Sequence, residues 1–256
     1  RSLLGKPATS ISLTSFRTYA LNRGTGWACQ DLHVYTEMWL LYLVEYANRN
    51  CQLAFNSALD SNGYHQGGLG DGVTTISSTA WNNYNGYNPM IPCGTTLSLG
   101  NNTGVVSYPV PNATEGSVFA TFSVPSYRGV ENPFGHVWKW TDGILVNIAA
   151  SGTSDVYVCD DPTKYASSLT ADYNKVGEEA RTSNYTQNVI FPYPIANQVG
   201  GSSATGYCDY HYTSIPSSGS SLRGVYWGGG ASAGAGAGFV YARSDLAPSR
   251  TDVNIG

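Results

Sequence analysis

The stretch of sequence that indicates the fold is residues 128–143, RGVENPFGHVWKWTDG. Trp138 and Trp140 are separated by one residue, so in an extended strand both side chains point to the same face and can enter one core. Asn132-Pro133 precedes this pair and Asp142-Gly143 follows it, and both dipeptides favour turns. These residues predict a core strand with a tight turn at each end.

A helix is expected upstream of this strand, over residues 31–50. Apolar side chains recur there at every third or fourth position, which is typical of a helix with one wide apolar face. Trp39 lies in the middle of that face. We therefore expect Trp39 to be buried, and the aromatic residues of the helix to form core rather than a ligand platform.

The rest of the chain alternates between short strands and turn-rich segments. The glycine-rich residues 67–72 lack the Lys-Ser/Thr ending of a phosphate loop and are interpreted as a backbone turn. Residues 160–206 have the pattern of loop with one short helix at most. Alternating runs predict strands at residues 105–108, 117–124, 143–149 and 154–159.

The composition excludes several partners. Only 12% of residues are charged and the net charge is -4, so the chain has no basic surface suited to nucleic acid. The longest apolar run, residues 38–44, is too short to cross a bilayer. We expect no nucleic-acid partner and no membrane insertion.

The cysteines are five, an odd number, and none forms a CxxC pair. This pattern argues against a disulfide framework and against structural zinc. It predicts buried free thiols in a protein that folds in a reducing cytoplasm.

The usual catalytic motifs are missing from the sequence. It contains no GxSxG, HExxH, Walker or dinucleotide-binding motif, and its four histidines are far apart in the chain. Adjacent carboxylates such as Asp160-Asp161 diverge in a strand or helix and make poor acid/base partners. We expect no enzyme activity, no metal and no cofactor.

Two segments carry a resemblance to a known family. GHVWKWT at residues 135–141 is similar to the GNVWEW signature of the formylglycine-generating-enzyme subgroup of C-type-lectin folds. LRGVYWGGGASAGAGAGF at residues 222–239 looks like the end of the same fold. More specifically, the chain resembles the variable proteins of diversity-generating retroelements, such as phage tropism determinants and prophage tail proteins.

The resemblance implies an α+β, C-type-lectin-like fold of the formylglycine-generating-enzyme subgroup with long ordered loops. Residues 1–26 would be an irregular lead-in or the end of a preceding region, and residues 27–256 the variable ligand-binding domain. Both ends of the sequence look cut, so we expect a fragment of a longer polypeptide. No cysteine follows Cys208, so the catalytic cysteine pair of the family's oxidases is missing.

The function implied is that of a receptor- or ligand-binding protein, at the tip of a phage or prophage tail fibre or in a displayed adhesin. Its C-terminal segment would be diversified by the retroelement. The expected partner is a protein or glycan on a cell surface, with a homotrimer formed through other regions of the full-length chain. The expected location is the virion or the cell surface. Alternatives are a formylglycine-generating-type oxidase and a calcium-dependent carbohydrate-binding lectin.

The ligand site is expected at bulky or polar residues set among small ones near the C-terminus. These residues follow neither a strand nor a helix period, and Tyr, Trp and Arg contribute strongly at interfaces. We expect them on one exposed face, where substitution leaves folding nearly intact. The competing interpretation is that the alternating Gly and Ala of residues 228–238 form a close-packed turn. The predicted ligand-binding residues are Tyr226, Trp227, Ser232, Tyr241, Arg243, Asp245, Leu246 and Arg250.

Overall fold

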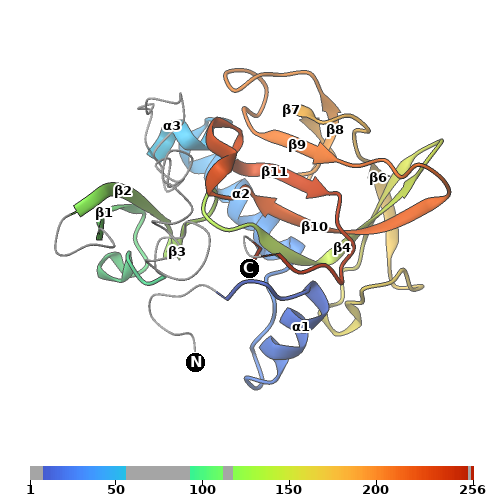
Figure 1. Ribbon diagram of the computed structural model, residues 1–256, viewed down its shortest axis with the longest axis horizontal. Helices are drawn as coiled ribbons and strands as arrows, with labels where there is room; N and C mark the ends of the chain where they lie inside the picture. Colours follow the sequence, from blue (N-terminus) through green and yellow to red (C-terminus); the bar gives the residue numbers. More distant parts are fainter. Residues whose placement is uncertain (1–7, 56–92, 112–117, 253–254) are drawn as a thin grey trace.

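The computed structural model describes residues 8–55, 93–111, 118–252 and 255–256, and its main feature is a curled mixed sheet of eight strands (Figure 1). The strand order is β6-β5-β4-β10-β11-β9-β7-β8. The strands are β4 (Lys139–Ala149), β5 (Ser154–Val158), β6 (Asn174–Glu178), β7 (Asn184–Val189), β8 (Ala196–Val199), β9 (Tyr210–Thr213), β10 (Ser220–Gly228) and β11 (Gly238–Ser244).

A smaller antiparallel sheet and a few helices complete the described chain. The sheet contains β1 (Gly104–Pro111), β2 (Val118–Tyr127) and β3 (Val130–Glu131). The α-helices are α1 (Leu13–Leu21), α2 (Leu32–Tyr46) and α3 (Cys51–Phe55), and short 3-10 turns occur at Leu97–Leu99, Pro162–Lys164 and Ala231–Gly236. None of the helices in the described ranges has the length and apolar character needed to cross a membrane.

The predicted α+β, C-type-lectin-like fold of the formylglycine-generating-enzyme subgroup is wrong. The described chain is mostly β, with an eight-stranded and a three-stranded sheet and few helical residues. The fold was inferred from two short motifs, and residues 160–206, expected to be loop, contain β6, β7 and β8 instead. These strands are rich in Asn and Gln and largely exposed, so they lack the apolar alternation that identifies a half-buried strand.

The predicted helix at residues 31–50 is confirmed as α2. Asp31 begins it as N-cap, with its Oδ1 accepting a hydrogen bond from the amide of Val34 at 2.9 Å. It ends at Ala47, which has the left-handed conformation typical of a helix C-terminus and donates its amide hydrogen to the Leu43 carbonyl. Trp39 is 2% exposed, as expected.

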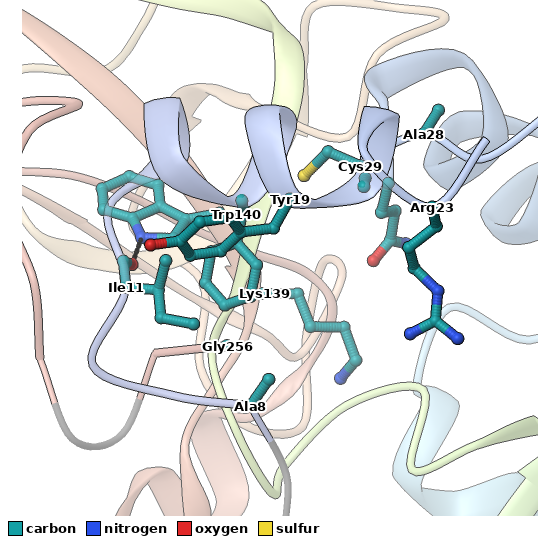
Figure 2. Close-up of a pocket in the computed structure, with 12 residues that line it drawn as sticks. Ala8, Ile11, Tyr19, Arg23, Ala28, Cys29, Lys139, Trp140 and Gly256 are labelled. Carbon is teal, nitrogen blue, oxygen red and sulfur yellow. Dashed lines mark hydrogen bonds between the residues drawn. The ribbon is translucent and has the colours of Figure 1, made fainter. Parts of the chain in front are cut away.

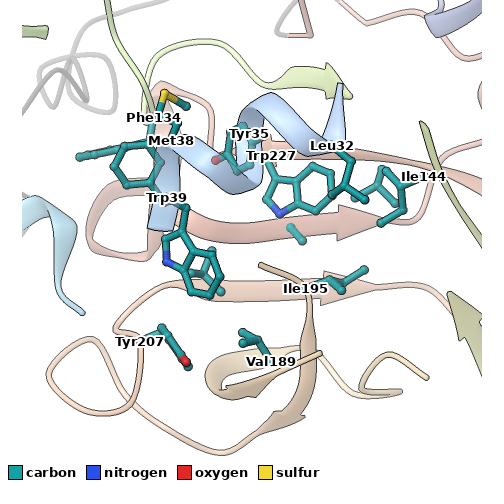
Figure 3. Close-up of a cluster of buried hydrophobic side chains, with 14 of the residues drawn as sticks. Leu32, Tyr35, Met38, Trp39, Phe134, Ile144, Val189, Ile195, Tyr207 and Trp227 are labelled. Atoms are coloured by element: carbon teal, nitrogen blue, oxygen red, sulfur yellow. The ribbon is translucent and has the colours of Figure 1, made fainter. Parts of the chain in front are cut away.

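Two hydrophobic clusters cover the two faces of the central strands. The larger cluster lies between α2 and the sheet, and within it Tyr35 of α2 stacks on Trp227 of β10 with ring centroids 5.3 Å apart (Figure 3). The second cluster, on the opposite face, contains Trp138, Trp140 and Tyr226. The prediction that both tryptophans of residues 128–143 enter the core is confirmed, because Trp138 is 4% and Trp140 1% exposed.

The N-terminal segment is part of this fold. Leu13–Leu21 forms α1, so the prediction of an irregular lead-in is wrong for these residues. Arg17 of α1 binds the buried carboxylate of Asp142 in β4 through its Nε and Nη2, each at 2.6 Å. Such a two-point contact fixes both distance and orientation, so it holds α1 against β4.

We predict that Trp138→Ala lowers the free energy of unfolding by about 3–5 kcal/mol, because the removed indole leaves a cavity in the second cluster. Trp27→Ala is the matched control, since Trp27 is 51% exposed and its loss should change stability by about 0.5 kcal/mol or less. Chemical denaturation of both variants measures the difference. Equal effects of the two substitutions would contradict this account of the core.

Candidate functional site

The predicted ligand-binding residues lie mainly on the two central strands. Tyr226 and Trp227 belong to β10, and Tyr241 and Arg243 to β11. Ser232 lies in the turn at Ala231–Gly236, and its side chain is outside the described part of the structure.

The expectation that these residues share one exposed face is wrong for three of them. Tyr226 is 1%, Trp227 0% and Tyr241 8% exposed. Neighbouring residues of a strand point to opposite faces, so Trp227 enters the α2 cluster and Tyr226 the second cluster. Because both faces of β10 are covered, polar residues do not alternate with apolar ones, and the sequence shows no period of two.

One row of side chains nevertheless leads from the core to the surface. The strand register places Trp140 of β4, Tyr226 of β10, Arg243 of β11 and Tyr212 of β9 side by side. Tyr226 packs edge-to-face on Trp140, with centroids 5.1 Å apart. At the outer end, the Arg243 guanidinium lies over the Tyr212 ring at 4.3 Å from its centroid. The row therefore ends in a cation held on an aromatic ring.

Asp245 fixes the position of this cation. Its carboxylate accepts hydrogen bonds from Arg243 Nε at 3.1 Å and Nη2 at 2.7 Å. The Tyr226 hydroxyl donates to the same carboxylate at 2.5 Å. Burial opposes the charge of Arg243, but these bonds to Asp245 prevail and raise the pKa of the guanidinium. Arg243 is therefore charged and held rigidly.

A second row of tyrosines extends the surface. Tyr241 of β11 packs edge-to-face on Tyr210 of β9 at 5.7 Å, and Tyr210 on Tyr185 of β7 at 5.2 Å. Tyr210 and Tyr212 alternate with the buried His211, so a strand with one aromatic face was visible in the sequence but was missed. Tyr185, Tyr210, Tyr212, Arg243, Asp245 and Leu246 together are called the sheet-face patch.

The patch is partly open to solvent. Tyr212 is 37% exposed, and the side chains of Arg243 and Asp245 are 27% and 11% exposed. Figure 1 shows α2 behind β10 and β11. Arg250, also predicted as a site residue, is exposed in the segment after β11. Among the predicted residues, Arg243, Asp245, Leu246 and Arg250 thus remain candidates for contact with a ligand.

The Gly- and Ala-rich residues 228–238 form a close-packed turn, as the competing interpretation predicted. A Cβ at Gly229 would lie 2.8 Å from the Cβ of Ala237, and one at Gly230 would lie 2.9 Å from Nε1 of Trp138. A Cβ at Gly238 would overlap the carboxylate of Asp209. Small residues are needed here for packing.

Buried polar side chains fix this turn and the strand that follows it through hydrogen bonds to their backbone. Gln52 of α3 donates through its Nε2 to the carbonyls of Gly234 and Ala237. Asp209 accepts a hydrogen bond from the Val240 amide at 2.8 Å. Burial raises the pKa of Asp209 well above its usual range. The turn is therefore anchored in the core.

A buried carboxyl group lies behind the patch. Glu179 Oε1 accepts hydrogen bonds from the hydroxyls of Thr213 in β9, at 2.9 Å, and Ser244 in β11, at 2.7 Å. Burial raises the pKa of Glu179 to about 8, although these bonds and Arg181 act in the opposite direction. Glu179 thus connects, in its protonated form, the two strands that display Tyr212 and Arg243.

The described residues include free thiols but no candidate metal site. They contain no group of three His, Cys, Asp or Glu side chains suited to a metal ion. All five cysteines are free, and Cys51, Cys159 and Cys208 are buried, as predicted for these three. Burial raises the pKa of Cys208 to about 11 and that of Cys29 to about 12, so these thiols are neutral at physiological pH.

Comparisons with known proteins do not name a family for this chain. No protein-family model matches the sequence, and no curated protein matches it either.

We predict that the contribution of Glu179 to the free energy of unfolding falls as pH rises, and that Glu179→Gln abolishes this pH dependence. The pKa of Glu179 is about 8 in the folded state, against 4.5 for the free group, so the folded state binds more protons between these values. Stability from this group is complete below pH 4.5 and is lost as pH rises towards 8. Between pH 6.5 and 8 the expected difference is about 2 kcal/mol.

The measurement is the free energy of unfolding of wild type and variant across pH 6.5–8. His136 and His211, with pKa values lowered by burial to about 3 and about 4, and Lys139, with a pKa lowered to about 8, are present in both proteins. Their contributions therefore cancel in the difference between wild type and variant. Glu178→Gln is the matched control, because the side chain of Glu178 is 50% exposed. Parallel pH profiles for wild type and Glu179→Gln would show that Glu179 is not protonated when buried.

Proposed function

We propose that this chain is a ligand-binding domain that recognises a protein or glycan target on a cell surface through the sheet-face patch. The observation that carries the proposal is Arg243, held between Asp245 and Tyr212 at the solvent-facing edge of an aromatic row. Tyr and Arg are the residue types that contribute most to binding at interfaces. A guanidinium that is already fixed loses little conformational freedom on binding.

The setting we propose is the tip of a phage or prophage tail fibre, or a displayed adhesin. Multivalent display through other regions of a longer chain would raise the affinity of a weak single site. The support for this setting is the resemblance of residues 222–239 to retroelement variable proteins, together with a patch at the end of that segment.

Burial restricts where a retroelement could diversify such a protein. Replacement of Tyr226 or Trp227 by a small polar residue would open a cavity or leave buried groups unpaired. Arg250 is exposed, and Arg243 and Leu246 are half-buried. Substitutions at these three positions should therefore cost less stability than substitutions at Tyr226 or Trp227.

We therefore expect a near-copy of the coding region for residues 226–256 beside a reverse-transcriptase gene, with differences concentrated at adenines. The differences should affect codons of residues 243–250 more than those of Tyr226 and Trp227. Sequencing of the neighbouring DNA provides the test. A near-copy with differences mainly at the two buried positions would contradict the assignment of the patch.

We predict that Tyr212→Ser weakens target binding at least tenfold while it changes the free energy of unfolding by about 0.5 kcal/mol or less. Tyr226→Ser should instead cost about 3–5 kcal/mol, because Tyr226 is buried in the second cluster. Binding is measured with immobilised protein against a glycan array and a panel of intact bacterial cells, and stability by chemical denaturation.

Trp27→Ala is the control for binding, since it removes an exposed aromatic ring outside the patch. It should leave the binding profile unchanged. If Trp27→Ala removes binding and Tyr212→Ser retains it, the recognition surface lies near α1 and the proposed patch is misplaced.

A further inference from the structure

A cavity of about 530 Å³ lies between α1, the segment that follows it, and the start of β4 (Figure 2). This volume is within the range of about 300–1,000 Å³ typical of small-molecule sites. Its apolar wall contains Ile11, Phe16, Ala20 and Trp140. The indole of Trp140 is fixed by a hydrogen bond from its Nε1 to the Ile11 carbonyl at 3.2 Å. Because Trp140 is 1% exposed, the part of the wall that a ligand can touch is formed mainly by Ile11, Phe16 and Ala20, which are half-buried.

Two cationic side chains, Arg23 and Lys139, also line this cavity, and no Asp or Glu of the described residues does. In the view of Figure 2 their charged ends lie on one side of the cavity, and Trp140 and Ile11 on the other. The Arg23 guanidinium is stacked over Trp27 at 4.2 Å from the ring centroid. The cavity thus combines an apolar side with a positive side.

Lys139 is a half-buried cation without a carboxylate partner in the described ranges. Its Nζ donates to the backbone carbonyls of Asn132 at 2.8 Å and Pro133 at 3.3 Å, and no ion pair of the described residues includes it. Burial lowers the pKa of Lys139 to about 8. A charge that is partly removed from water is stabilised by an opposite charge nearby, so an anion in the cavity would be favoured.

A second, adjoining cavity of about 270 Å³ shares Phe16 and Lys139 with the first. Glu131 lines it, but both carboxylate oxygens are engaged by Gly94 and Thr96. His136 and Asn132, each 5% exposed, also line it. Their Nε2 and Oδ1 atoms are buried and find no hydrogen-bond partner within the described chain. Unpaired buried polar atoms are rare in native proteins and point to a missing polar ligand or water.

We propose that the larger cavity, of about 530 Å³ beside α1, binds a small organic anion with a flat apolar body, of the aromatic carboxylate class. The ring would lie against Phe16 and Ile11, above the buried indole of Trp140. The carboxylate would face Arg23 and Lys139. This site is separate from the sheet-face patch: none of the six patch residues lines either cavity. The proposal therefore does not depend on the proposed function.

The test uses isothermal titration calorimetry of the full chain with 2-naphthoate and with its neutral isostere 2-naphthamide. We expect measurable binding of the carboxylate and at least tenfold weaker binding of the amide. Arg23→Gln should weaken naphthoate binding at least fivefold, because it removes one cation at an exposed position. Arg49→Gln is the matched control: Arg49 is also exposed and stacked on an aromatic ring, Tyr207, but does not line the cavity, and it should have no effect.

Ala20→Phe, which places a ring in the cavity, should abolish naphthoate binding, whereas Tyr212→Ser should leave it unchanged. Melting temperatures establish that each variant is folded, and if Ala20→Phe does not fold, the Arg23→Gln and amide comparisons decide. The proposal is overturned by equal affinity for acid and amide, by equal effects of Arg23→Gln and Arg49→Gln, or by no naphthoate binding at millimolar concentration.

Discussion

Burial of both faces of β10 is the constraint on which the rest of the structure depends. Trp227 packs against α2 on one face, and Tyr226 packs against Trp138 and Trp140 on the other. A shift of one residue in register would exchange these two side chains between differently shaped clusters. The register of β4, β10 and β11 is therefore fixed from both sides, and it determines where Arg243 emerges.

The same constraint separates scaffold from surface within a short segment. Between residues 226 and 246 the chain passes from the fully buried Trp227, through the packed turn at Ala231–Gly236, to the partly exposed Arg243. Glycine and alanine are needed in the turn because Trp138 and Asp209 occupy the space that larger side chains would require. The bulky residues Tyr226, Trp227 and Tyr241 of this segment thus belong to the core. Exposure to solvent begins at Arg243.

The sequence was sufficient to predict features that depend on local pattern. The periodicity of α2, the burial of Trp138 and Trp140 and the strands β4 and β5 follow from side-chain spacing. The C-type-lectin-like fold, in contrast, was inferred from two short motifs, and the polar strands β6 to β8 carry no apolar alternation that could have corrected it. Of the candidate patch, Arg243 and Asp245 were predicted from the sequence, where they lie close together. Tyr185 and Tyr212 join them only through strand pairing.

A rigid scaffold would let one chain hold the two proposed sites, which differ in their chemistry. The patch is built on strands that Glu179 connects from behind through Thr213 and Ser244. The cavity is built where Arg17 holds α1 against β4. The second cluster connects the two sites. Trp140 lines the cavity and contacts Tyr226, and the Tyr226 hydroxyl donates a hydrogen bond to Asp245 of the patch. A ligand that moved the Trp140 indole would therefore shift Tyr226, and with it the carboxylate that positions Arg243.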